Sequence, residues 1–428
     1  MRIDRLRIKN FKAFDDREFT FPEQFTVLIG DNGTGKTSVL DTLAIAAGSY
    51  LLGIDGVAAI AIEKDEIRRV SYDRQSFEYQ FPVQIEAVGK IYETELRWLR
   101  SLEYLTGRTT REKSRSIIAL AQKHQKLVRA GNRTENLPLL AYHGTGRLWA
   151  EHKAKVEYKR AGSRTEGYLD CLSPKSSSKQ FLSWYKTYFD SRQKFDYPQD
   201  REVIDTFNHA ITTMVPEWQK IAFDFVEDDL VGFYQITPNE TKYLPYRLLS
   251  DGFRNMIGIV ADIAYRCIKL NPHLGQAALT ETEGIVLIDE IDLHLHPKWQ
   301  KRIVEDLKRV FPKLQFVVTT HSPFVVQSLK NTELINLNVD TGLDPFRMSL
   351  EEVAETEMLV DNVTRSKRFD EMTALATEYY QLIATGKNSE NSEEVVHLRQ
   401  KLNQLEEVYG NDPAFVALLK AERQTAAL

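Results

Sequence analysis

One eight-residue segment constrains this chain more than any other feature of its sequence. The segment matches the pattern G-x-x-x-x-G-K-S/T at every fixed position and consists of Gly30, Asp31, Asn32, Gly33, Thr34, Gly35, Lys36 and Thr37. The apolar run 25–29 before it predicts a buried strand, and residues 37–44 after it have helical character. A glycine-rich turn between a strand and a helix is the setting in which this motif binds phosphate. We therefore expect a nucleotide-phosphate site in an α/β fold.

The residue types in this segment fit the contacts that a polyphosphate needs. Glycines let backbone N–H groups close around phosphate oxygens, and the following helix N-terminus, which includes Ser38, favours negative charge. Lys36 would reach the outer phosphates, and the Thr37 hydroxyl would bind Mg²⁺. The alternative, a chance glycine-rich turn, is disfavoured by the flanking strand and helix.

A pair of acidic residues follows a second buried strand. The apolar run 284–288 ends at Asp289 and Glu290. Because the backbone turns at the end of a strand, Asp289 can face Mg²⁺ while Glu290 faces an attacking water. The next apolar run, 314–318, leads to His321 at the same predicted sheet edge. A lone histidine is usually structural, but one beside two acids at a sheet edge is a functional candidate, so we expect catalytic roles for Glu290 and His321.

Strand patterns at both ends of the chain predict one sheet that is interrupted by an insertion. Helices are expected at 116–128 and 180–195, and an antiparallel hairpin is expected around a turn at Gly89-Lys90. The predicted divisions are an N-terminal part with the glycine loop (1–100), a basic and mainly helical insertion (101–244), a C-terminal part of the α/β unit (245–345) and a helical C-terminal region (346–428).

Charge is distributed unevenly along the chain. The formal net charge is −5, yet residues 97–164 hold 16 Lys plus Arg against 5 Asp plus Glu, which is a net of +11. This segment is a candidate surface for an anionic partner such as nucleic acid. Residues 349–428 hold 15 acidic and 8 basic residues, a net of −7, and read as solvated helices.

Composition excludes several classes of protein. With 42% hydrophobic and 27% charged residues, the chain is typical of globular proteins rather than of disordered ones. The sequence has no apolar run of about 20 residues and no signal-peptide pattern at Met1, so we expect a cytoplasmic protein. Cys171 and Cys267 are far apart and lack C-x-x-C spacing, which excludes a disulfide framework and predicts buried packing residues.

A short polar segment precedes a predicted apolar helix in the C-terminal part. Leu249-Ser250-Asp251-Gly252-Phe253 places Ser250 where a helix N-cap would be, and an N-cap is its simplest interpretation. Together with the glycine loop and the acidic pair, this segment resembles the signature loop of an ABC-type ATPase head of the RecF/SMC/OLD-like group. The resemblance implies that Ser250 and Gly252 bind the γ-phosphate of ATP held by another subunit. Asp251 departs from the L-S-G-G-Q pattern of that group and adds negative charge beside a phosphate.

Other segments resemble the same group. Residues 9–12 are similar to the I-x-N-F-K/R start of SMC and RecF heads, which implies that Lys12 contacts the nucleotide; simple exposure is the alternative. Residues 291–297 are similar to the D-loop of RecF-like and OLD-like ATPases. Asp292, His294 and His296 in that segment invite a metal interpretation, but histidines at i and i+2 need a third ligand and a supporting shell. His321 resembles the histidine that contacts the γ-phosphate.

The segment 139–149 lies at the position of the Q-loop of that group but contains no glutamine, so no Q-loop residue is assigned. Arg147 in this segment can either sense phosphate or pair with an acidic neighbour.

The resemblance is strongest to the PtuA-type ATPases of Septu and retron-associated anti-phage systems. It implies an ABC-type head with a mixed sheet and an antiparallel β subdomain, ATP and Mg²⁺ as cofactors, an ATP-linked pair of heads, and a separately encoded HNH nuclease as partner. The second possibility is a RecF/SMC-type repair ATPase that itself binds duplex DNA. No Asp-x-Asp pair of the kind a Toprim nuclease requires occurs in the sequence, so no intrinsic nuclease is expected. Residues 393–408 and the break at 410–413 suggest either a helical hairpin that docks a partner or a lid on the chain's own core.

Overall fold

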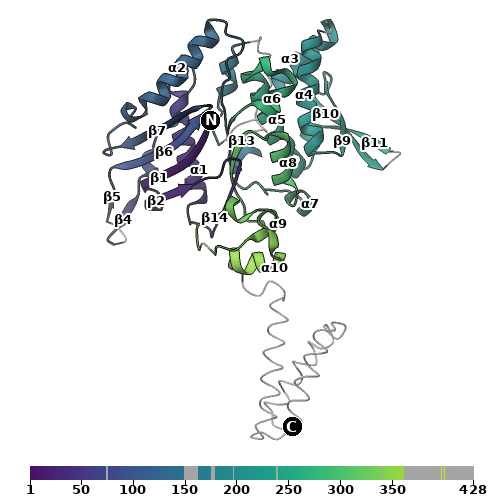
Figure 1. Cartoon of the computed structure of the whole chain (residues 1–428). Helices are drawn as coiled ribbons and strands as arrows, with labels where there is room; N and C mark the ends of the chain where they lie inside the picture. Colours follow the sequence, from purple (N-terminus) through teal and green to yellow (C-terminus); the bar gives the residue numbers. More distant parts are fainter. Residues whose placement is uncertain are drawn as a thin grey trace. The chain divides into compact units, whose positions relative to one another are not determined.

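The computed structural model describes residues 1–73, 76–148, 162–174, 179–195, 197–237, 240–339 and 341–360, together with His397 and Gln400. The chain divides into a compact unit, Met1–Val353, and a second unit, Ala354–Leu428. The labelled helices and strands in Figure 1 belong to the first unit. The helices predicted for 393–408 and the break at 410–413 lie outside the described residues, apart from two isolated positions.

A five-stranded parallel sheet forms the centre of the compact unit. Its strands, in spatial order, are β14 (Leu334–Asn336), β3 (Phe25–Ile29), β13 (Leu314–Thr319), β12 (Gly284–Ile288) and β8 (Leu139–His143). Every residue of β3, β12, β13 and β8 is buried, as expected for parallel strands covered on both faces. The prediction that strands from both ends of the chain share one sheet is confirmed.

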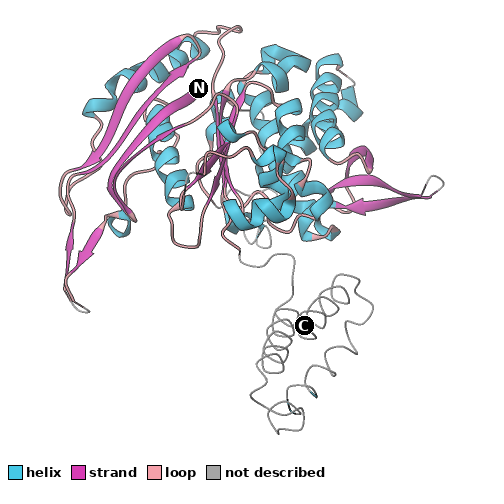
Figure 2. Ribbon diagram, turned by 60° about the horizontal axis from the view of Figure 1, so that its bottom comes forward, coloured by secondary structure: helices cyan, strands magenta, loops and turns pink. Residues whose placement is uncertain are grey.

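A separate antiparallel sheet packs beside this centre. Its spatial order is β2 (Phe14–Thr20), β1 (Arg2–Phe11), β6 (Val83–Ile91) and β7 (Thr94–Leu102), and a small ribbon of β4 (Arg69–Ser71) and β5 (Phe77–Tyr79) extends from it. Helix α1 (Lys36–Leu51) contacts both sheets (Figure 2). Of its 16 residues, 14 are buried. The predicted α/β class is therefore confirmed, with parallel and antiparallel strands in separate sheets rather than in one mixed sheet.

The predicted hairpin exists, but its turn lies further along the chain. Strands β6 and β7 meet at Tyr92-Glu93, so Gly89 and Lys90 belong to β6. A Cβ on Gly89 would overlap the backbone oxygen of Arg2 on β1, where the register shifts between Ile3 and Arg5. The glycine therefore permits close strand approach rather than a turn.

The middle of the chain contains more strand than predicted. It contains three α-helices, α2 (Arg115–Arg129), α3 (Lys179–Phe195) and α4 (Pro198–Met214). A three-stranded antiparallel sheet of β9 (Trp218–Asp224), β10 (Asp229–Thr237) and β11 (Glu240–Pro245) follows them in the chain. Strand β8 also lies within 101–244, yet it pairs with β12 in the central sheet. The segment is therefore not a separate helical insertion, because its buried run 139–143 completes the core of the α/β unit.

The remaining described α-helices lie in the C-terminal part of the compact unit, before, between and after strands β12, β13 and β14. They are α5 (Asp251–Leu270), α6 (Ala278–Glu281), α7 (Pro297–Gln300), α8 (Ile303–Val310), α9 (Pro323–Gln327) and α10 (Leu350–Glu352). Most residues of α5 are buried, and the helix contacts α4 and β8. Cys171 and Cys267 are free and buried, as predicted.

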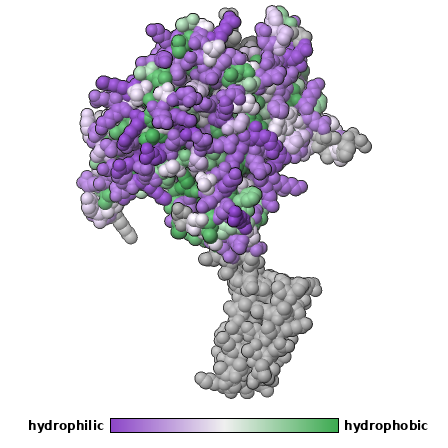
Figure 3. Space-filling model, viewed as in Figure 1, coloured by the Kyte–Doolittle hydropathy of each residue, from purple (hydrophilic) through white to green (hydrophobic). Residues whose placement is uncertain are grey.

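The outer surface of the unit has an ordinary polar character. The face drawn in Figure 3 is mainly hydrophilic, with scattered apolar patches. Among the described residues, no helix combines the length and the apolar character that crossing a bilayer would require.

Candidate functional site

The carboxyl ends of four parallel strands meet at one edge of the central sheet. The glycine loop follows β3, Gly144 follows β8, Asp289 follows β12 and Thr320 follows β13. Ligands of α/β proteins bind in the crevice outside such strand ends. A cavity of about 340 Å³ lies at this edge, and its lining consists of Lys12, Ala13, Asn32, Gly33, Gly35, Lys36, Thr37, Ser38, Asp289, Glu290, Thr319 and His321.

Most of the residues predicted from the sequence therefore line one cavity. Gly30, Asp31 and Thr34 belong to the same loop but not to the lining. The predicted signature residues Ser250 and Gly252 are not in the lining either. This site thus contains the phosphate-loop, acidic and histidine components from one chain, but not the signature component.

The glycine loop has the backbone shape that its sequence predicts. Gly33 and Gly35 have φ values of +89° and +99°, a region that residues with a Cβ rarely adopt. A Cβ on Gly35 would also lie 2.7 Å from the Phe14 ring. Helix α1 starts directly after Gly35, so its free N–H groups face the cavity edge.

The Lys36 side chain spans its own loop. Its Nζ donates hydrogen bonds to the carbonyl oxygens of Gly30 at 2.7 Å and Asp31 at 3.0 Å. Burial lowers the pKa of Lys36, and the charges of Asp289, Asp31 and Glu290 oppose that shift. A phosphate near Nζ would supply the counter-charge that a buried ammonium requires.

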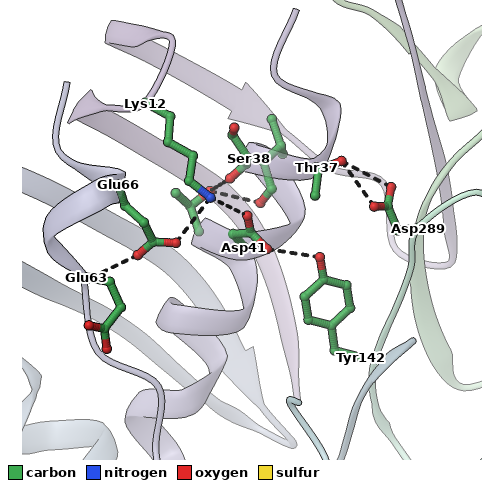
Figure 4. A network of polar contacts seen from close by, with 10 residues as sticks. Lys12, Thr37, Ser38, Asp41, Glu63, Glu66, Tyr142 and Asp289 are labelled. Atoms are coloured by element: carbon green, nitrogen blue, oxygen red, sulfur yellow. Dashed lines mark hydrogen bonds and ion pairs between the residues drawn. The ribbon is translucent and has the colours of Figure 1, made fainter. Parts of the chain in front are cut away.

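Asp289 is held by two hydroxyl groups. Thr37 Oγ1 donates to Oδ2 at 3.1 Å, and Thr319 Oγ1 donates to Oδ1 at 2.6 Å. Figure 4 shows the Thr37 contact. Thr319 was not predicted as a site residue, because its local sequence does not indicate that its hydroxyl bonds to Asp289. The Thr37 and Asp289 oxygens are the donor type that Mg²⁺ prefers, so this pair fits that ion.

Glu290 leaves the strand in a strained conformation. Its φ is +50°, which is uncommon for a residue with a side chain. The Glu290 N–H bonds to Thr319 Oγ1 at 2.7 Å, while the Asp289 N–H bonds to the His143 carbonyl at 2.8 Å. The two neighbouring acids thus differ in backbone direction, as the sequence argument expected of a strand end. His321 lines the same cavity with an exposed side chain.

Lys12 occupies a carboxylate cluster at the cavity margin. Its Nζ lies 2.7 Å from Asp41 and 3.2 Å from Glu66, and Tyr142 donates to Asp41 at 3.0 Å (Figure 4). Burial opposes the charged form, but the two carboxylates raise the pKa of Lys12. The simple exposed interpretation is therefore wrong, since Lys12 is half-buried and paired. Asp41 and Tyr142 were not identified from sequence, because they join only in the folded chain.

Ser250 stands at the N-cap of α5, as predicted, but its hydroxyl makes no capping hydrogen bond. The Asp251 carboxylate is paired with Arg254, which offsets the negative charge that the signature segment was expected to carry. Gly252 packs on the D-loop, since a Cβ at this position would overlap the His294 carbonyl oxygen.

The D-loop side chains bond to nearby groups. Asp292 Oδ1 accepts from Thr320 Oγ1 at 2.5 Å, and His296 Nδ1 accepts from the Lys298 N–H at 3.2 Å. No group of three or more His, Cys, Asp or Glu side chains that could hold a metal ion occurs in the part of the chain that the structure describes.

Arg147 is buried behind the acidic pair. Its guanidinium donates to the backbone oxygens of Gly144, Asp289 and Glu290 at 2.9, 2.8 and 3.0 Å, and to Asn255 Oδ1 at 2.5 Å. Burial lowers the pKa of Arg147 to about 10, so the guanidinium stays charged at neutral pH. It therefore binds the backbone of the acidic residues, rather than their carboxylates, and it does not line the cavity.

Known proteins have sequences similar to this one. Residues 25–327 match a family model described as "AAA domain, putative AbiEii toxin, Type IV TA system". The chain is 26% identical over 388 residues to the retron Vc95 probable ATPase of Vibrio cholerae serotype O1 biovar El Tor, across 79% of this chain and 74% of that protein. It is 26% identical over 437 residues to the Septu protein PtuA of Bacillus thuringiensis, across 94% of this chain and 93% of that protein.

Among solved structures, the chain resembles an SMC head bound to the C-terminal winged-helix domain of ScpA. The TM-score is 0.47 at 17% identity, and the match covers 77% of this chain and 93% of that one. The family assignment depends instead on the sequence match, which spans more than half of the chain. The chain therefore belongs to the AAA domain family of that description, as an ATPase related to the retron ATPases and to Septu PtuA.

Proposed function

We propose that this chain binds ATP with Mg²⁺, hydrolyses it slowly or under regulation, and uses that cycle to control a separately encoded HNH-type nuclease in bacterial anti-phage defence. The observation that carries the proposal is the single cavity that Lys36, Thr37, Asp289, Glu290 and His321 line. The names of the related proteins support the defence setting, since they are a retron ATPase and a Septu protein.

The residues of the cavity divide the chemical work among them. Lys36 and the N–H groups of the loop bind the phosphates. Thr37 and Asp289 would hold Mg²⁺, which offsets phosphate charge when it is bound. Glu290 is the general base that takes the proton of the attacking water, and His321 contacts the outermost phosphate. Lys12 contributes positive charge at the margin.

A pair of chains would complete the site. The signature residues Ser250 and Gly252 do not line the cavity of their own chain, and the Ser250 hydroxyl has no capping partner. In a two-fold pair, each α5 N-terminus would face the nucleotide of the other chain.

The first experiment separates binding from hydrolysis. Glu290→Gln should bind ATP like the unchanged chain and hydrolyse it about 10² to 10⁴ times more slowly, because an amide cannot accept the proton. Lys36→Ala should lose ATP binding, whereas Lys64→Ala, an exposed lysine on a surface turn, should not. Normal turnover by Glu290→Gln would show that another residue is the base, and normal ATP affinity of a folded Lys36→Ala chain would refute the phosphate site.

A second experiment tests the partner. The chain is co-expressed with the HNH reading frame adjacent to its gene, and nuclease activity is measured with ATP and with a non-hydrolysable analogue. Nucleotide-dependent control of the nuclease supports the proposal. A genome without such a neighbour, or a nuclease indifferent to nucleotide, contradicts the defence role while leaving the ATPase assignment intact.

A DNA repair ATPase is the second candidate function, and helix α2 favours it. The helix carries Arg115, Lys123, Lys126 and Arg129, all exposed, and no acidic residue. Within the described part of the chain, no ion pair is found for Lys123 or Lys126. If the isolated protein binds duplex DNA with a steep salt dependence, and Lys123→Glu with Lys126→Glu removes that binding, the repair role gains support.

A further inference from the structure

Arg147 connects three segments that are distant in sequence. It lies on the short 3₁₀ turn Thr145–Leu148 after β8, and its guanidinium reaches the end of β12 and the first turns of α5. Only 5% of its surface is exposed. A buried charge of this kind needs hydrogen bonds to most of its donors, and these four acceptors supply them.

Asn255 closes these contacts into a ring. Its Oδ1 accepts from Arg147 Nε, while its Nδ2 donates to the Leu293 carbonyl of the D-loop at 2.7 Å. The Leu293 N–H in turn bonds to the Glu290 carbonyl at 3.0 Å, the same oxygen that Arg147 Nη2 contacts. Asn255 is 2% exposed, so water does not replace either bond easily.

The ring surrounds the backbone that gives Glu290 its direction. Consecutive carbonyl oxygens of Asp289 and Glu290 both point at the planar guanidinium, although Glu290 has a φ of +50°. A backbone in this region is strained and persists only where neighbouring groups fix it. Arg147 supplies such a constraint, and lysine cannot, because its ammonium lacks the planar fork.

We propose that Arg147 is a positioning residue, which holds Glu290 in its hydrolytic orientation and ties that orientation to the position of the α5 N-terminus through Asn255. The inference rests on the proposed ATPase function and adds a coupling within the chain. Ser250, the N-cap of α5, lies five residues before Asn255. If contact with a partner's nucleotide moves α5, the orientation of Glu290 should therefore change as well.

The test compares two arginines that bind carbonyl oxygens, the buried Arg147 and the half-buried Arg164. Arg164 donates to the backbone oxygens of Leu270 and Glu135 and lies near Asn271 Oδ1, so it matches Arg147 in kind but has no contact with the acidic pair. Arg147→Lys, Arg147→Met, Arg164→Lys and Arg164→Met are assayed for ATP affinity, turnover and thermal unfolding. We expect both Arg147 variants to lose turnover, by about 10²-fold for Arg147→Met, with ATP affinity within about twofold. Both Arg164 variants should keep turnover.

A cycle with Glu290 separates positioning from general structural support. In a Glu290→Gln chain, Arg147→Met should cause no further loss of turnover, because the group it positions is already inactive. If the losses multiply instead, or if turnover follows unfolding temperature across all four arginine variants, the inference is overturned. Absence of hydrolysis by the unchanged chain would refute the proposed function itself, whereas Glu290-dependent hydrolysis that is indifferent to Arg147 would refute only this inference.

Discussion

The Thr37 hydroxyl donates a hydrogen bond to the Asp289 carboxylate at 3.1 Å, although the two residues are 252 positions apart. The bond joins the first turn of α1 to the end of β12, so it connects the glycine loop to the acidic pair. The Thr37 hydroxyl oxygen and the Asp289 carboxylate oxygen are both ligand atoms of the type that Mg²⁺ prefers. The relationship leads directly to a prediction about the ion.

Asp289→Asn should make ATP binding insensitive to Mg²⁺. The amide keeps the shape, and its one carbonyl oxygen can still accept a hydrogen bond from a threonine hydroxyl, but it has lost the negative charge that a divalent cation requires. We expect the gain in ATP affinity that Mg²⁺ gives the unchanged chain to fall by about 10- to 100-fold. Titrations of ATP with and without Mg²⁺ measure this, with Asp15→Asn as the control at an exposed position. An undiminished Mg²⁺ effect in Asp289→Asn would contradict the predicted site.

Gly252→Ala should separate α5 from the D-loop. A new Cβ would overlap the His294 carbonyl oxygen, which is backbone and cannot rotate away. Overpacking of this kind costs about 1–3 kcal/mol. ATP binding, measured on the isolated chain, should persist, while turnover should fall because the signature segment is displaced. Gly258→Ala on the same helix is the control, since its Cβ would lie 2.9 Å from the Tyr246 hydroxyl, a side-chain end. Equal turnover in both variants would mean that this contact is unimportant.

Local sequence was sufficient for the elements that carry the phosphate site. The strand 25–29, the loop and the helix after Lys36 follow from a fixed spacing and from short-range periodicity, and the structure confirms each of them. The buried strand before Asp289 follows from the same kind of pattern.

Features that depend on contacts between segments distant in sequence could not be predicted. Gly89 suggested a turn, but its absent Cβ accommodates β1 instead. Strand β8 was not separated from the basic middle, because five buried residues carry no periodicity that distinguishes strand from helix. For Arg147 the sequence left two interpretations, a contact with phosphate or an ion pair with an acidic side chain. The observed hydrogen bonds to the carbonyl oxygens of Asp289 and Glu290 were not predicted, because no sequence pattern indicates such backbone contacts.

His124 predicts a pH dependence of stability. It is buried on α2, and its Nδ1 lies 2.8 Å from the Tyr50 hydroxyl. Burial, assisted by the charge of Lys123, lowers the pKa of His124 from 6.5 to about 4 in the folded chain. Between about pH 4 and 6.5 the unfolded state therefore binds more protons, so the free energy of unfolding should decrease as pH falls through this window.

Urea unfolding at several pH values measures this contribution. His124→Gln should reduce the slope between pH 4 and 6.5, because one residue that must lose its proton on folding is gone, while His143, whose pKa burial also lowers to about 4, remains. His209→Gln, at an exposed position on α4, should leave the slope unchanged. The same slope in all three proteins would exclude His124 as the cause.

The last prediction concerns pairing of two chains. Ser250 is exposed at the start of α5 and is not in the cavity lined by Lys36, so in the proposed pair each site would receive one contribution from each chain. Lys36→Ala and Ser250→Arg should each be inactive alone. Mixing them should restore ATPase activity, because a mixed pair contains one site with an intact Lys36 and an intact Ser250. The α5 N-terminus would favour the partner's phosphate by about 0.3–1 kcal/mol when exposed, and by more when enclosed.

The mixing experiment tests whether the ATPase site is shared between two chains. Recovered activity, rising with the fraction of mixed pairs and absent when two copies of one variant are mixed, establishes a shared site. No recovery from folded chains that exchange subunits leaves two explanations: both sites must act together, or Ser250 serves its own chain. Cysteine crosslinking separates them, because Ser250→Cys should crosslink to Asn32→Cys between chains in the presence of ATP only if α5 faces the partner's glycine loop. Crosslinks confined to single chains would contradict the paired arrangement.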